Sequence, residues 1–167
     1  SEFWSKVGTN EEAVRQATYI DWYSKGLNDD DVKAIACLIS SGSLASLKEL
    51  YLYQNQIGDE GIKAFSTALS SGALASLNLL YLGWNQIGDE GMKAFSTALS
   101  SGSLASLTKL WLSDNQIADA GMIAFAEALK PTSNFPVGSL NSLTNLFLEY
   151  NPASNSAKDT MKAVASS

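Results

Sequence analysis

The stretch Leu74–Ala98, LASLNLLYLGWNQIGDEGMKAFSTA, recurs along the chain. It is nearly identical to residues 44–68 before it and is echoed by residues 104–128 after it, each at an offset of 30 residues. Self-similarity at a fixed period of roughly 20–45 residues is typical of stacked repeats, in which each unit packs only against its neighbours. The sequence therefore predicts a short solenoid, not a globular domain built around a single hydrophobic core of its own.

Each repeat changes its hydrophobic period halfway along. The alternation of Leu50 and Leu52 suits a strand with one buried face. The spacing of Ile62, Phe65 and Leu69 by three and four residues suits one stripe of a helix. One strand and one helix in every unit predict an α/β fold, with parallel strands on one side and parallel helices on the other.

The strand half of the repeat carries the pattern L-x-x-L-x-L-x-x-N-x-I. It occurs at residues 47–57, 77–87 and 107–117, in looser form at 143–153, and in degenerate form from Ala17 to Leu27. This pattern, followed by GDEGIKAFSTAL, resembles the leucine-rich repeat family in its ribonuclease-inhibitor-like subclass. The resemblance implies a right-handed solenoid of about five repeats of 30 residues. It also implies a concave parallel sheet, α-helices on the convex side, and a protein-binding function.

The repeat divides the chain into one leucine-rich-repeat domain, 1–167, with a cap at each end. The predicted parts are an N-terminal cap at 1–16, repeats at 17–46, 47–76, 77–106 and 107–142, and a C-terminal capping repeat at 143–167. The fourth repeat is longer, which predicts a loop insertion near 132–137 that contains Phe135 and Pro136. In the N-terminal cap, the Thr9-x-x-Glu12 spacing predicts a short helix that starts near Thr9.

Composition excludes several classes of function. A net charge of −6, from 11 basic and 17 acidic residues, argues against a nucleic-acid partner, because phosphate binding needs clustered Lys and Arg. The absence of His removes histidine triads and histidine metal sites. No phosphate loop, nucleophile elbow or calcium loop appears, and no apolar run is long enough to span a membrane. We therefore expect no catalysis, no cofactor, no metal and no membrane span.

The single cysteine, Cys37, excludes internal disulfides and favours a reducing, cytoplasmic or other intracellular compartment. The chain begins without Met, and Ser1-Glu2-Phe3 fits a cloning remnant. An organelle is the alternative location if this N-terminus is a processed one. Cys37 aligns with Thr67 and Thr97, so we expect it on the convex helices, without a basic group to activate it.

Two sets of polar residues recur with the repeat. Asn55, Asn85, Asn115 and Asn151 are expected to bond backbone groups in the turns and to be structural. Asp59, Glu60, Asp89, Glu90 and Asp119 follow one edge, which Asn28-Asp29-Asp30-Asp31 continues. Helix-start electrostatics accounts for this acidic edge. The alternative is steering of a partner with a basic surface.

The candidate site is a row of aromatic residues on the predicted concave face. Four of its members occupy the same position in successive repeats and three flank them: Tyr51, Tyr81, Trp111 and Phe147, with Tyr53, Trp84 and Tyr150. Aromatic residues are also good strand formers, and stacking across strands alone accounts for such a row. Trp84 favours a binding surface instead, because it interrupts a copy that otherwise matches its neighbour, where Gln54 stands.

These observations predict a scaffold or protein-interaction module that binds a protein partner through the aromatic face. One alternative is an accessory subunit held permanently in a larger assembly, with Trp4, Trp22 and Phe135 as docking residues. Another is carbohydrate binding by the aromatic residues.

Overall fold

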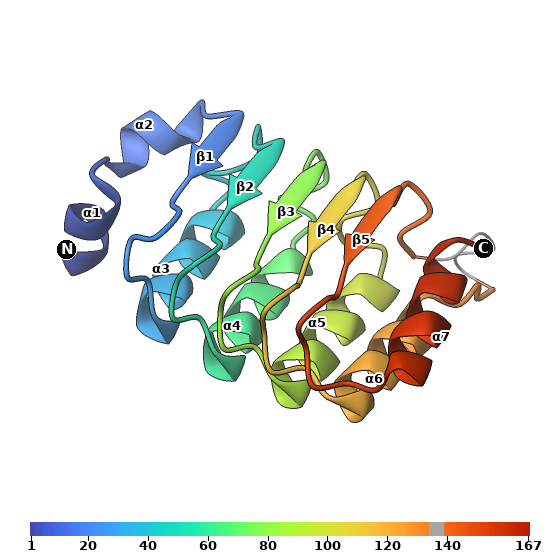
Figure 1. Cartoon of the computed structure of the whole chain (residues 1–167). Helices are drawn as coiled ribbons and strands as arrows, with labels where there is room; N and C mark the ends of the chain where they lie inside the picture. Colours follow the sequence, from blue (N-terminus) through green and yellow to red (C-terminus); the bar gives the residue numbers. More distant parts are fainter. Residues whose placement is uncertain (134–138) are drawn as a thin grey trace.

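The computed structural model describes residues 1–133 and 139–167. Two short helices come first, and strands and helices then alternate to the end of the chain (Figure 1). In chain order the elements are α1 (Glu2–Val7), α2 (Glu11–Arg15), β1 (Tyr19–Asp21), α3 (Asp29–Ser40), β2 (Glu49–Tyr51), α4 (Asp59–Leu69), β3 (Leu79–Tyr81), α5 (Asp89–Ser100), β4 (Lys109–Trp111), α6 (Asp119–Leu129), β5 (Asn145–Phe147) and α7 (Asn155–Ala165).

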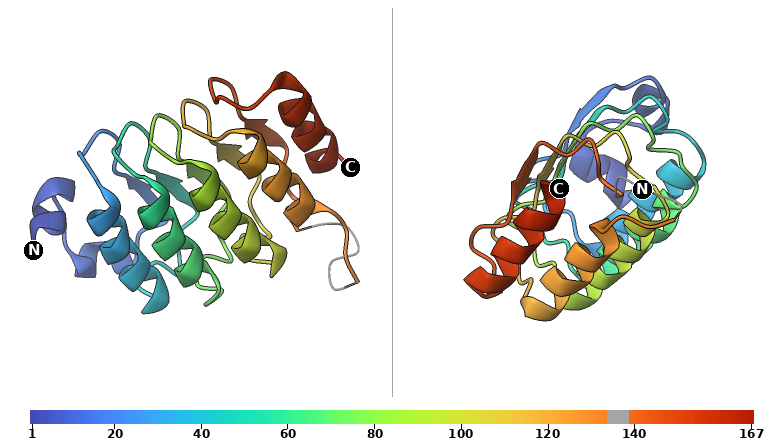
Figure 2. Two further views of the ribbon diagram at one scale, coloured as in Figure 1. Left: turned by 90° about the horizontal axis from the view of Figure 1, so that it is seen from below. Right: turned by 90° about the vertical axis from the view of Figure 1, so that its right-hand side faces the viewer.

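The strands form one parallel sheet in the order β1-β2-β3-β4-β5. Equivalent positions of successive repeats lie opposite each other, as Leu50 does with Leu80 and Leu80 with Leu110. Helices α3 to α7 form a row that covers one side of the sheet, which leaves the other side open (Figures 1 and 2). The predicted α/β solenoid is confirmed, whereas the exact division into a cap, repeats and a capping repeat stays a prediction.

The core lies between the sheet and the helices. Leu50, Leu80 and Leu110 are fully buried there, as the repeat predicts. Leu146, which pairs with Leu110 in the sheet register, is only half-buried. Its strand, β5, pairs only with β4 among the described strands, so Leu146 is covered from one side.

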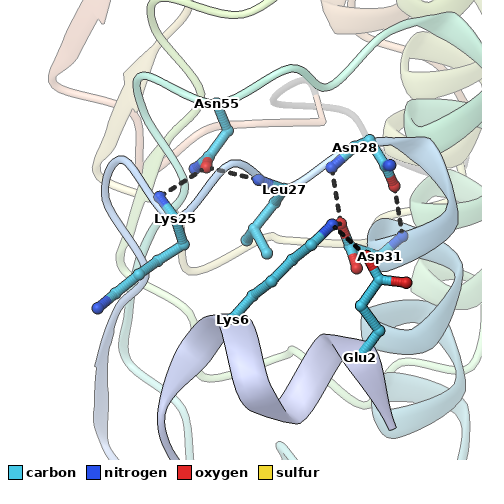
Figure 3. Close-up of polar contacts among 7 residues, drawn as sticks. All are labelled: Glu2, Lys6, Lys25, Leu27, Asn28, Asp31 and Asn55. Carbon is cyan, nitrogen blue, oxygen red and sulfur yellow. Dashed lines mark hydrogen bonds and ion pairs between the residues drawn. The ribbon is translucent and has the colours of Figure 1, made fainter.

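The repeated asparagines hold adjacent turns together, as predicted. The Oδ1 atom of Asn55 accepts hydrogen bonds from the backbone N–H groups of Lys25 and Leu27, both at 3.0 Å (Figure 3). Its Nδ2 atom donates to the carbonyl oxygens of Trp22 and Leu52. One amide thus satisfies backbone groups in two successive repeats, which the short strands cannot pair.

The N-terminal helices close the first repeat. Lys6 of α1 donates to Asp31 at 2.7 Å, and Asp31 also accepts from the backbone of Asn28 in a capping box at the start of α3 (Figure 3). Trp22 is buried against Phe3, with ring centroids 5.3 Å apart. Trp22 is therefore not available as a docking residue, contrary to the assembly alternative.

Two details of this cap differ from the prediction. The N-cap of α2 is Asn10, not Thr9, because the Asn10 side chain accepts from the backbone of Ala13 at 3.0 Å. A separate helix, α1, precedes it. At the other end of the chain, Phe135, Pro136 and most of the predicted loop insertion lie outside the described residues.

The acidic edge has a role that we did not predict. Asp59 Oδ1 accepts hydrogen bonds from the backbone N–H groups of Gly88 and Gly91 in the next repeat, at 2.7 and 3.0 Å. Equivalent bonds join Asp29 to Gly58 and Asp89 to Gly121. These aspartates therefore link repeat to repeat, in addition to standing at helix N-termini.

Candidate binding groove on the open face of the sheet

The predicted aromatic row is continuous in the structure. Tyr51, Tyr81, Trp111 and Phe147 end β2 to β5 and lie opposite one another in the sheet register. Their ring centroids are separated by 4.6, 5.4 and 4.4 Å in turn. Each follows a leucine that points toward the helices, so strand alternation directs the rings to the open face. Tyr19 extends the row, 5.2 Å from Tyr51.

Part of this row forms a groove of about 290 Å³. Its lining residues are Tyr51, Tyr53, Tyr81, Gly83, Trp84 and Trp111. Five of the seven predicted site residues therefore meet in one place. Phe147 stacks on Trp111 beside the groove, whereas Tyr150 is 80% exposed and does not line it.

Gly83 is a lining residue that the sequence analysis missed. A Cβ atom at this position would lie 2.9 Å from Cδ1 of Trp111 and 3.1 Å from the carbonyl oxygen of Ser113. Only glycine leaves the space into which the Trp111 indole extends. The sequence contains one sign of this role, because two nearly identical repeats differ at this position, with Tyr53 in one and Gly83 in the next.

Trp84 occupies a backbone conformation that rarely holds a large side chain. Its φ angle is 55°, as the turn requires, since Gln54 and Asp114 have φ angles of 58° and 57° at the same position. Bulky residues at positive φ are uncommon because Cβ approaches the backbone. Trp84 is nevertheless 61% exposed, so core packing does not explain it. This combination makes Trp84 a candidate for a functional role.

Replacing Trp84 by Asn is expected to leave stability unchanged or raise it by up to about 1 kcal/mol, because Asn tolerates the left-handed region. Urea denaturation followed by circular dichroism measures this change. Gln54→Asn in the preceding repeat is the matched control and should show a gain of the same sign. A loss of more than about 1 kcal/mol in Trp84→Asn would mean that Trp84 supports the fold.

Carboxylates lie beside the aromatic rings. The Tyr51 hydroxyl donates to Glu49 at 2.9 Å, and the Tyr19 hydroxyl donates to Asp21 at 3.3 Å. Burial, followed by the bond to Glu49, raises the pKa of Tyr51 well above its usual value. Tyr51 therefore stays a neutral hydrogen-bond donor to Glu49 over the physiological range.

The chemistry needed for a metal centre does not assemble in the described part of the chain. No group of three or more His, Cys, Asp or Glu side chains is placed there to hold a metal ion. Among the same residues, no helix has the length and hydropathy needed to cross a membrane. Cys37 is exposed and unpaired by any disulfide, on α3.

Comparison with known proteins is consistent with this architecture. A family model described as "Leucine Rich repeat" matches residues 43–66, 73–96 and 103–126. Among solved structures, "Leiomodin-1 Actin-Binding Site 2 (ABS2)" is similar to this chain with a TM-score of 0.69 and 15% sequence identity, over 99% of this chain and 88% of that one. At that identity the likeness concerns the fold alone.

An internalin C2 from Listeria monocytogenes is also similar, over 92% of this chain and 83% of that one. Its sequence identity is 16% and its TM-score is 0.31, so nothing further is drawn from it. No curated protein sequence matches the chain.

Proposed function

Because the chain belongs to the leucine-rich repeat family, we propose that it is a non-catalytic module that binds a protein partner through the aromatic groove. The single observation that carries this proposal is Trp84, a large exposed side chain at a strained position where the fold needs none. It stands at the edge of a groove whose other walls are also aromatic. Tyr and Trp are the residues that most often dominate binding energy at protein interfaces.

The size of the groove favours a macromolecular partner. A volume of about 290 Å³ is at the lower limit for a complete small-molecule site. It suits one inserted side chain of a larger partner, held by aromatic anchors and surrounded by weaker contacts. The aromatic row continues on both sides of the groove, from Tyr19 to Phe147, and offers further contact area.

The structural neighbour agrees with a binding role without identifying a partner. The leiomodin-1 structure is that of an actin-binding site of that protein. A fold of this shape thus serves protein binding there, and repeat solenoids in general present extended surfaces to partners. The ribonuclease-inhibitor-like subclass and a basic surface on the partner stay predictions for this chain.

Truncation of the aromatic row should weaken partner binding. Trp111→Ala or Tyr81→Ala is expected to cost about 2 kcal/mol, or about 30-fold in Kd, because each removes a ring that packs against two others. The measurement is the affinity of a partner isolated with the native chain. Ile123→Ala is the matched control, since Ile123 is a large exposed apolar residue, 56% exposed, on α6. Unchanged affinity in both aromatic variants would overturn the proposal.

The two alternative functions have weaker support. The accessory-subunit alternative named Trp4, Trp22 and Phe135, of which Trp22 is buried and Trp4 half-buried, while Phe135 is not described. The carbohydrate alternative shares the aromatic groove and stays a prediction. The carbohydrate alternative would be favoured if the native chain bound sugars on an array and Trp84→Ala lost this binding while it still bound the protein partner.

A further inference from the structure

We propose that the aromatic groove is a cage for a trimethylated lysine side chain on an extended segment of the partner. This inference rests on the proposed function and names the chemical group that the partner inserts. The five aromatic residues of the cage are Tyr51, Tyr53, Tyr81, Trp84 and Trp111.

The rings of the cage stand at steep angles to one another. Tyr51 and Tyr81 meet at 88° with centroids 4.6 Å apart, and Tyr81 and Trp111 meet at 74°. Tyr51 and Tyr53 meet at 65°. These are edge-to-face contacts, which aromatic pairs prefer in any protein. At the border of the groove the rings stack instead, Trp111 on Phe147 at 26° and Tyr53 on Tyr23 at 23°. The feature that favours a cation is the lining of one volume by five aromatic side chains, because a cation is attracted to ring faces.

Negative charge accompanies these rings. The hydrogen bond from Tyr51 to Glu49 at 2.9 Å fixes a carboxylate beside the cage. Asp114 is the residue of the following repeat that is equivalent to Trp84. The two turns lie side by side, because the Trp84 N–H donates to the carbonyl oxygen of Ser113 at 3.0 Å. Lys109 is the one basic residue on the strands. The carboxylates complement a cationic ligand and disfavour an anionic one.

The backbone carbonyls around the cage are already hydrogen-bonded, so the acceptors left for a cation are the tyrosine hydroxyls and the Glu49 carboxylate beside them. The carbonyl oxygens of Tyr51, Tyr81 and Trp111 already accept from N–H groups of the neighbouring strand ends. The carbonyl of Gly83 accepts from Gln54 N–H and from the Asn85 side chain. An ammonium or guanidinium group would have only these side-chain acceptors for its several N–H donors, and each donor left without a partner is costly. A trimethylammonium group has no N–H donor.

The row of rings beyond the cage favours a protein segment as the source of this group. The rings run across all five strands, from Tyr19 to Phe147, whereas a lipid headgroup would occupy the cage alone. Neighbouring strands are about 4.8 Å apart, so the row is about 19 Å long. An extended segment of about six residues matches that length.

The test is an NMR titration that follows the indole N–H signals of Trp84 and Trp111. The probes are three blocked Ala-Ala-Lys-Ala-Ala peptides. One has trimethylated lysine, one has unmodified lysine, and one has a neutral analogue in which carbon replaces the trimethylated nitrogen. We expect the trimethylated peptide to bind at least about tenfold more tightly than either of the others, because only it combines the charge with an apolar surface. Phosphatidylcholine vesicles form a fourth arm.

Two variants check that binding occurs in the cage. Trp84→Ala should weaken binding of the trimethylated peptide at least about tenfold. Tyr150→Ala should not change it, since Tyr150 is an exposed aromatic residue at the same position of the last repeat but does not line the groove. Comparison of urea midpoints confirms that both variants are folded.

Several results would overturn the cage. Equal binding of the neutral analogue would show an ordinary apolar groove, and binding of the vesicles without the peptide would identify a lipid ligand. If no peptide shifts the indole signals while Trp111→Ala still loses the protein partner, the cage fails and the proposed function stands. If Trp111→Ala and Tyr81→Ala both keep the protein partner with unchanged affinity, the proposed function fails whatever the peptides do.

Discussion

Asn85→Ala is expected to lower the free energy of unfolding by about 3–5 kcal/mol. Asn85 Oδ1 accepts from the backbone N–H of Ile57 at 3.0 Å. Its Nδ2 atom bonds the carbonyl oxygens of Leu52, Leu82 and Gly83. These four bonds all lie in the buried layer, and each backbone group left unsatisfied costs about 1–3 kcal/mol. Urea denaturation measures the loss.

The control for Asn85 is in the preceding turn. Gln56 is exposed, and Gln56→Ala should change stability by less than about 0.5 kcal/mol. Amide exchange adds a local readout, because Ile57 N–H should lose protection in Asn85→Ala beyond the global loss. A drop in stability below about 1 kcal/mol would show that water replaces the Asn85 side chain, and the asparagines would then not be what joins the repeats.

The row of rings could be predicted from the sequence because it depends only on the repeat. An unbroken offset of 30 residues places Tyr51, Tyr81 and Trp111 at one position of successive strands. Strand alternation then directs them away from the buried leucines. Neither step requires knowledge of the side chains that surround the row in the folded protein.

Gly83 and the aspartates could not be predicted in this way. The role of Gly83 depends on the volume that Trp111 fills in the next repeat, and a missing side chain gives no pattern of its own. Asp59 follows the usual composition of a helix start, so the sequence does not show that its carboxylate bonds Gly88 and Gly91 in the next repeat. Both roles are contacts between repeats, which a pattern within one repeat cannot reveal.

Tyr150 shows the limit of reasoning by equivalent positions. It stands where Trp84 stands in its own repeat, with a similar φ of 58°. The groove, however, is formed by β2, β3 and β4 and by the segments that follow β2 and β3, so Tyr150 at the turn after β5 lies beyond it. Position in the repeat predicts which face a side chain occupies, and the neighbouring residues decide whether it lines the groove.

Gly91→Ala is expected to destabilise the chain by about 2–3 kcal/mol, although Ala is about 1 kcal/mol better than Gly inside an exposed helix. A Cβ at Gly91 would lie 2.6 Å from Oδ1 and 3.2 Å from Cα of Asp59. It would push the carboxylate away from the N–H groups of Gly88 and Gly91, which it now bonds at 2.7 and 3.0 Å. Urea denaturation of Gly91→Ala measures the sign, which is opposite to that expected from helix propensity.

A double-mutant cycle with Asp59→Ala separates the lost hydrogen bonds from the steric clash. Asp59→Ala alone removes the two bonds, and in the double variant the oxygen that a Cβ would meet is absent. The loss in the double variant should therefore be smaller than the sum of the single losses by at least about 1 kcal/mol. Additive losses would mean that Gly91 is required for another reason. A clear coupling would show that the helices of adjacent repeats are joined by the Asp59 carboxylate, and that this contact requires the absence of a side chain at Gly91. The stability of the strands that carry the groove would then depend on the helices that pack on the opposite face of the sheet, because each repeat is stabilised mainly by its neighbours.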